Sequence, residues 1–185
     1  MTADSDKRLL EVFRERAVSR GEFTLSSGRR TSVYFDGRMV TLWPEGAYLI
    51  GRKIFHMLEG VEVDAVGGMT MGADPIAAAV ALVSHQEGKP IPAFIVRGGV
   101  KDHGTQKRIE GPLRAGSKVA IVDDVITSGA SVLRAIEAVE AEGCQVVRVV
   151  VLLDRQQGGA DEIRRRGYDF AAILTADAEG TVNLA

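Results

Sequence analysis

Short apolar runs alternate with helical patterns along the last two thirds of the chain. The runs cover 63–67, 91–96, 118–122, 146–153 and 170–174. Helical spacing of apolar residues falls between them, at 75–85, 131–142 and 160–166. Continuous apolar runs joined by helices are typical of parallel strands that helices cover on both faces. The pattern therefore predicts an α/β fold with a central parallel sheet of about five strands flanked by helices.

The first 60 residues have a different pattern. Residues 6–18 show the spacing of an amphipathic helix, and residues 22–36 predict two short strands around a turn. A second helix is expected from Pro44, which suits the first helical position, to about Gly60. This segment lacks the alternation of strand and helix that marks the rest of the chain.

Length and composition narrow the class of protein. We expect one domain over residues 1–185, with a small N-terminal subdomain of about residues 1–60, here called the hood, on an α/β core of about 61–185. The net charge of −2 argues against a nucleic-acid partner. A single cysteine excludes a disulfide framework and fits a reducing cytoplasm. No apolar run is long enough to span a membrane, so no membrane partner is expected.

Two adjacent acids, Asp123 and Asp124, end the third apolar run and precede a turn rich in small residues that opens a helix. The turn and its flanks are Val125, Ile126, Thr127, Ser128, Gly129, Ala130 and Ser131. Backbone N–H groups, hydroxyls and a helix N-terminus at the carboxyl end of a strand suit a phosphate. Because carboxylates repel phosphate, the acids fit sugar hydroxyls nearby, or a role in holding a cation. An ordinary capped turn is the alternative interpretation.

A connection of about 21 residues, 97–117, carries little apolar periodicity, and loops of that length inside a domain are usually functional or disordered. It contains several glycines, and its basic residues include Arg97, Lys101 and His103. A mobile cationic loop suits a diphosphate leaving group, because it can close over the site and neutralise developing charge. A solvated charged loop is the alternative.

Three further residues suggest a planar, anionic ligand. Arg155 directly follows the strand predicted at 146–153, and its forked donors suit a carboxylate. Tyr34 and Phe35 could enclose a ring, although alternating aromatic residues in short strands also serve as core packing.

The segment around Asp123 and Asp124 resembles the phosphoribosyl diphosphate (PRPP) signature of the type I phosphoribosyltransferases. Further matching segments narrow the resemblance to the orotate phosphoribosyltransferase family. They are 23–29 with 34–36, 67–75, 97–111 and 154–159. The match runs in order from about residue 20 to 160.

The resemblance implies transfer of phosphoribosyl from PRPP to orotate, giving orotidine 5′-monophosphate and pyrophosphate, in pyrimidine biosynthesis. It assigns Asp123 and Asp124 to the ribose hydroxyls and residues 127–131 to the 5′-phosphate, with Val125 and Ile126 also at PRPP. It assigns Arg97, Lys101 and His103 to the diphosphate. It places Thr127, Arg155, Tyr34 and Phe35 at orotate. Magnesium is expected to ride on PRPP with no direct protein ligand, and a homodimer is expected in which the 97–111 loop completes the neighbour's site.

The chain departs from the family at three positions where lysine is common, namely Ser26, Met71 and Gly98. Two alternatives remain. One is a phosphoribosyltransferase for another base, and Arg155 argues against it because purines and uracil carry no carboxylate. The other is a PRPP-binding regulator, and the Lys101-x-His103 loop and the absence of a basic DNA-binding segment argue against that.

Overall fold

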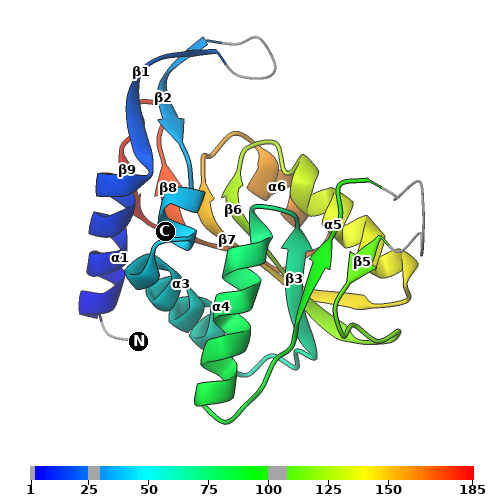
Figure 1. Cartoon of the computed structure of the whole chain (residues 1–185). Coiled ribbons are helices and arrows are strands. Elements are labelled where there is room, and N and C mark those ends of the chain that lie inside the picture. The colour runs from blue at the N-terminus through cyan, green and yellow to red at the C-terminus, as the bar shows by residue number, and fades with distance from the viewer. Residues whose placement is uncertain (1–2, 25–29, 100–107) are drawn as a thin grey trace.

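The computed structural model describes residues 3–24, 30–99 and 108–185. A seven-stranded sheet runs through the molecule in the order β5-β4-β3-β6-β7-β8-β9 (Figure 1). The five inner strands are parallel, as expected. They are β4 (Ala93–Val96), β3 (Ala65–Met69), β6 (Lys118–Ile126), β7 (Gln145–Asp154) and β8 (Phe170–Ala176).

The prediction of about five strands was too low, because one short antiparallel strand is added at each edge. β5 (Ile109–Glu110) pairs with β4, and β9 (Val182–Leu184) pairs with β8. Strands of two and three residues are too short to show an apolar period. The parallel α/β architecture itself is confirmed.

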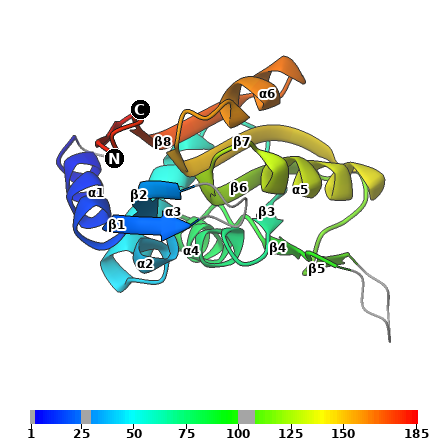
Figure 2. The same cartoon turned by 90° about the horizontal axis from the view of Figure 1, so that it is seen from above.

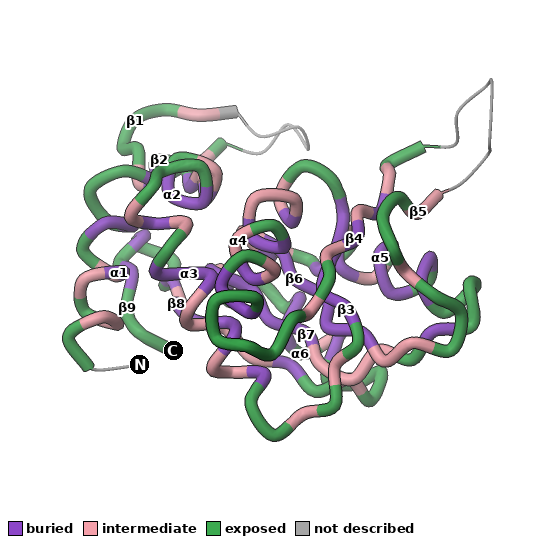
Figure 3. The backbone as a smooth tube through the Cα atoms, turned by 60° about the horizontal axis from the view of Figure 1, so that its bottom comes forward, coloured by how far each residue is buried: buried purple, intermediate pink, exposed green. Residues whose placement is uncertain are grey.

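Helices cover both faces of the sheet, and alternate residues of β6 show how. Ala120 and Val122 belong to a core cluster with α3 (Pro44–Met57) and α4 (Ala73–Gln86). Val119 and Ile121 belong to a second cluster with α5 (Ala130–Ala141) and α6 (Gly159–Arg165). All four β6 residues are fully buried, and Figure 3 shows the buried positions gathered along the strands and the inner helix faces. The unbroken apolar run of this strand follows from having two cores to fill.

The hood gathers at one end of the sheet (Figure 2). It contains α1 (Ala3–Arg16), the antiparallel pair β1 (Val18–Thr24) and β2 (Arg30–Phe35), and the short α2 (Arg38–Thr41). β1 and β2 form a separate two-stranded sheet. The four-residue α2 was not expected, because one turn carries no periodic signal.

The hood and the α/β core share apolar packing. Phe13 of α1 stacks on Phe35 with ring centroids 6.5 Å apart, and α3 and α4 lie in the same core cluster. Arg14 donates to the backbone carbonyl of Val182, which ties α1 to β9 at the sheet edge. A boundary near residue 60 stays a prediction. None of the helices described is long and apolar enough to cross a membrane.

Candidate active site

The acid pair lies at the carboxyl end of β6, the central strand of the sheet. Asp123 is only 4% exposed, and its Oδ2 accepts a hydrogen bond of 2.7 Å from the Ser131 hydroxyl of α5. Its Oδ1 accepts from the backbone N–H of Asp124 at 3.0 Å. Asp124 Oδ1 in turn accepts from the Val125 N–H at 2.9 Å. These bonds fix both carboxylates against the strand and the following helix.

The environment of the pair disfavours two full negative charges. Burial raises the pKa of Asp123 to about 7, and the charge of Asp124 adds to the rise, while the Ser131 hydrogen bond opposes it. Burial also raises the pKa of Asp124, and both the Val125 N–H and the Arg38 guanidinium oppose that rise. Burial leaves the carboxylate oxygens with fewer hydrogen-bond donors than they would have in water. A ligand that donates hydrogen bonds to these oxygens is therefore favoured.

The turn after β6 is held by the turn between β7 and α6. Gly129 precedes α5 with φ +82°, a conformation that glycine tolerates best, and offers no side chain to cap the helix. The Gly159 N–H donates to the Thr127 carbonyl at 2.9 Å. A Cβ at Gly159 would lie 2.5 Å from that same oxygen. The two turns therefore meet backbone to backbone, and an open helix N-terminus faces the site, as an anion requires.

Arg155 and the two hood aromatic residues meet at the other side of the site. The Arg155 N–H donates to the Ile126 carbonyl at 3.1 Å, and its guanidinium carbon lies 5.0 Å from the Phe35 ring centroid. Phe35 is 6% exposed and packs in the core, whereas Tyr34 is 37% exposed and lies against Phe23. Alternation along β2 thus gives the two aromatic residues different surroundings, with Phe35 beneath the arginine.

Arg97 lies at the end of β4, whose carboxyl end shares a sheet edge with the acids. Its guanidinium pairs with Glu110 at 3.1 Å, and its N–H donates to the Arg108 carbonyl at 2.9 Å. The ion pair closes the antiparallel connection from β4 to β5. Lys101 and His103, and the lysine replacement Ser26, lie outside the described residues.

A hollow of about 250 Å³ opens between the hood and the acid pair. Its lining consists of Tyr34, Phe35, Asp36, Arg38, Met71, Gly72, Asp124 and Val125. Asp36 ends the matching segment 34–36 but had no predicted role, and Arg38 lies outside every matching segment. Met71, one of the three departures noted in the sequence, is 64% exposed at this hollow.

Two glycines show how closely the surrounding backbone approaches the acids. A Cβ at Gly37 would lie 2.8 Å from Asp124 Cβ. A Cβ at Gly72 would lie 2.4 Å from Asp123 Oδ1 and 2.5 Å from Asp124 Oδ1. The acid pair is therefore enclosed between the hood turn and the turn after β3, and neither position has room for a side chain.

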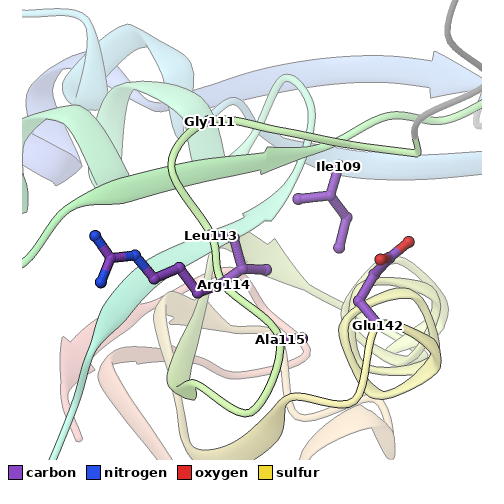
Figure 4. A pocket seen from close by; sticks show the side chains of 6 residues that line it. All are labelled: Ile109, Gly111, Leu113, Arg114, Ala115 and Glu142. Carbon is purple, nitrogen blue, oxygen red and sulfur yellow. The ribbon is translucent and has the colours of Figure 1, made fainter.

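A second, smaller hollow of about 120 Å³ lies at the far end of α5 from the acid pair (Figure 4). Its lining is Ile109, Gly111, Leu113, Arg114, Ala115 and Glu142. None of the sequence-predicted site residues lines it. The hollow beside Asp124, by contrast, is lined by the predicted site residues Tyr34, Phe35, Asp124 and Val125.

An α/β sheet with parallel inner strands, in which two acids end the central strand and a short turn then opens a helix, is the arrangement of the phosphoribosyltransferase fold. The family model for the phosphoribosyl transferase domain matches residues 43–172, and the chain belongs to this family. An orotate phosphoribosyltransferase of Nostoc sp. is 45% identical over 170 residues, covering 91% of this chain and 82% of the relative. One of Rhodopirellula baltica is 42% identical, covering 95% of this chain and 96% of the relative.

Solved structures agree with the sequence comparison. Orotate phosphoribosyltransferase of Mycobacterium tuberculosis, in complex with Fe(III) dicitrate, has a TM-score of 0.83 at 39% identity, over 92% of this chain and 96% of that chain. The same protein in complex with PRPP has a TM-score of 0.79 at 37% identity, over 92% of this chain and 96% of that chain. The resemblance drawn from the sequence is confirmed.

Proposed function

We propose that this chain transfers the phosphoribosyl group of PRPP to orotate, giving orotidine 5′-monophosphate and pyrophosphate. The observation that carries the proposal is the buried acid pair on β6 beside an open helix N-terminus. Sugar hydroxyls donate to the acids, and the 5′-phosphate accepts from the backbone of the turn. The names of the relatives agree with this activity.

The reaction needs positioning and charge stabilisation more than acid–base chemistry. N1 of orotate attacks C1 of the ribose as the bond from C1 to the diphosphate oxygen breaks, and the N1 proton passes to the leaving diphosphate or to water. Positive charge develops on the sugar and negative charge on the leaving diphosphate. Asp123 and Asp124 fix the ribose at C2 and C3, and cations of the 97–111 loop, Lys101 first among them, receive the diphosphate.

Arg155 supports orotate as the base. Its backbone is tied to Ile126, and the Phe35 ring lies beneath its guanidinium, so the side chain is held above the turn that follows the acids. A guanidinium there can form a bidentate pair with the orotate carboxylate. Uracil and the purines offer no such group, which makes another base the weaker candidate.

Magnesium fits the proposal as a passenger of PRPP. In the described part of the chain no group of three or more His, Cys, Asp or Glu is placed to hold a metal ion. Magnesium usually retains waters and binds substrate phosphates with few protein ligands. Bound this way, the ion would neutralise diphosphate charge, while Asp123 and Asp124 keep their oxygens for the ribose.

A homodimer is part of the proposal, with the 97–111 loop completing the neighbour's site. Four large apolar side chains of α2 and α3 and the turn between them are exposed, namely Met39, Leu42, Trp43 and Tyr48. Clustered exposed apolar residues support an interface, and their segment continues directly from Arg38 at the hollow. The free buried Cys144 is in keeping with a cytoplasmic location.

The test follows orotate absorbance in the presence of PRPP and magnesium. Loss of absorbance that requires PRPP, with no product from uracil, supports the proposal. Product from uracil or a purine but not orotate would assign another base. PRPP binding with no transfer to any base would assign a regulator. An Arg155→Gln variant should raise KM for orotate about 10-fold or more and leave PRPP binding unchanged.

A further inference from the structure

Arg38 stands at the start of α2 and is held by one carboxylate. Its Nε and Nη2 donate to the two oxygens of Asp36 at 2.8 and 3.0 Å, and its backbone N–H donates to Asp36 Oδ1 at 3.1 Å. A bidentate pair of this kind fixes the guanidinium plane as well as its position. No sequence motif and no step of the mechanism above accounts for it.

The backbone of the turn that carries this ion pair lies directly against Asp124. The Asp36 N–H donates to the Ala17 carbonyl at 2.9 Å, and the Val40 N–H donates to the Gly37 carbonyl at 3.0 Å. Between them, Gly37 has no room for a Cβ because Asp124 Cβ lies there. The turn therefore carries Arg38 and Asp36 to the wall of the hollow that Asp124 also lines.

The charges around Asp124 oppose one another. Arg38 favours its ionised form, whereas Asp36 on the same turn and Asp123 on the same strand disfavour it. From α5 the Ser131 hydroxyl bonds to Asp123 only, and the turn after β3 presents the backbone of Gly72. At the hood side of the site, Arg38 thus opposes the effects of Asp36 and Asp123 on the charge of Asp124.

We propose that Arg38 is a positioning residue for PRPP: its ion pair with Asp36 sets the charge balance beside Asp124 and so governs how strongly Asp124 accepts the ribose hydroxyls. The inference rests on the proposed function, because it assigns the ribose to Asp124. It adds to that function a specific arrangement, in which the Asp36–Arg38 ion pair of the hood adjusts the charge of Asp124 in the core.

Opposite charge changes at the two members of the pair separate this role from simple loosening of the turn. Arg38→Gln leaves Asp36 uncompensated, and Asp36→Asn leaves Arg38 uncompensated while keeping an oxygen for the Arg38 N–H. The double variant restores neutrality. PRPP affinity should fall at low pH as Asp124 takes up a proton, and we call this part of the pH profile the acid limb. It should move up by about half a pH unit in Arg38→Gln and down by a similar amount in Asp36→Asn. The shifts are small because both groups are partly exposed and solvent screens their charges. In the double variant it should return close to the wild-type position.

Calorimetric titration with PRPP and magnesium at a series of pH values measures the limb without any turnover. Arg38→Lys should keep the limb in place. Arg8→Gln is the matched control, because Arg8 also forms a bidentate pair, with Glu45, at 43% side-chain exposure against 40% for Arg38. That variant should leave the limb unmoved.

The titration of the Asp124 carboxyl carbon, followed by NMR in the ligand-free protein, should shift in the same two directions. This readout separates the inference from the proposed function, because absence of PRPP binding by the wild-type protein would overturn the function alone. The inference is overturned if Arg38→Gln and Asp36→Asn move the Asp124 titration in the same direction, or if neither moves it.

Discussion

Asp123 is a site residue whose burial lowers the stability of the fold. Its carboxyl group is 4% exposed and accepts hydrogen bonds from Ser131 and the Asp124 N–H. These bonds do not offset its burial, because the pKa is raised to about 7. A group that served only stability would not keep a charge in such a place.

The raised pKa of Asp123 sets the direction of its pH effect on stability. The folded state holds the proton more tightly than the unfolded chain, whose aspartates titrate near pH 3.9, so stability falls as pH rises from about 4 through 7. Asp123→Asn should remove that loss. Chemical denaturation at pH 8 should show the variant more stable by on the order of 2 kcal/mol, with PRPP affinity reduced. Equal stabilisation at pH 4 and pH 8 would contradict this account.

Lys101 belongs to the mechanism through the leaving group. Lys101→Ala should lower kcat by on the order of 100-fold, because the departing diphosphate then loses a cation that the protein supplies as its charge grows. Orotate binding, measured by calorimetry, should change far less. An unchanged kcat would remove Lys101 from the mechanism.

The sequence revealed the residues that belong to a motif and missed those that act through proximity. Asp123, Asp124 and the following turn were predictable because strand, acids and helix start are contiguous. Arg38 was not, because its nearness to Asp124 depends on the hood turn meeting β6 across 86 positions of sequence. Phe35 was predicted at the base; its ring lies beneath Arg155 and lines the hollow, and its contact with the base stays a prediction.

At the scale of elements, the site is built from turns that meet without side chains between them. The turn after β3 reaches the acids through Gly72, and the turn after β7 reaches the phosphate-type turn through Gly159. The inner strands were predictable from continuous apolar runs, whereas β5, β9 and α2 were too short to carry a period. Close contact between two turns leaves even less trace in a sequence than a short strand does.

Gly72→Ala tests the closeness of that contact. The new methyl group would lie 2.4 Å from Asp123 Oδ1, so the turn and the acids must separate. We expect KM for PRPP to rise about 10-fold or more with little change in thermal stability, because Gly72 and Asp124 line the hollow and have open space beside them.

Gly51→Ala is the matched control for Gly72→Ala. Its methyl group would lie 2.9 Å from the Ala79 carbonyl, between α3 and α4 and away from the acids. Overpacking there should lower stability by about 1–3 kcal/mol and leave KM for PRPP unchanged. If Gly72→Ala instead lowered stability and left KM for PRPP unchanged, the contact of Gly72 with the acids would matter for folding and not for PRPP binding.

At the scale of the whole molecule, each chain supplies two separable parts of the proposed dimeric site, the acid pair and the 97–111 loop. Lys101→Ala and Asp124→Asn damage different parts. If the loop acts on the neighbour's site, a mixed dimer contains one site with both parts intact.

Mixing the two inactive variants should therefore restore activity. After subunit exchange, roughly a quarter of the wild-type rate is expected, because about half the dimers are mixed and each has one complete site. Each variant alone, treated in the same way, provides the baseline. A loop acting within its own chain would give no restoration, and sedimentation as a monomer would remove the dimer altogether.

The contact of Gly37 with Asp124 determines which parts of the hood can be changed by mutation and which cannot. In the described residues β1 and β2 form a sheet of their own, so their exposed side chains can be changed without altering the pairing of the seven-stranded sheet. The Asp36–Arg38 turn has no such freedom, because its backbone fills the space beside the acid. A protein engineer can therefore vary the exposed side chains of the hairpin, but must keep that turn, and Phe35 beneath Arg155, in place.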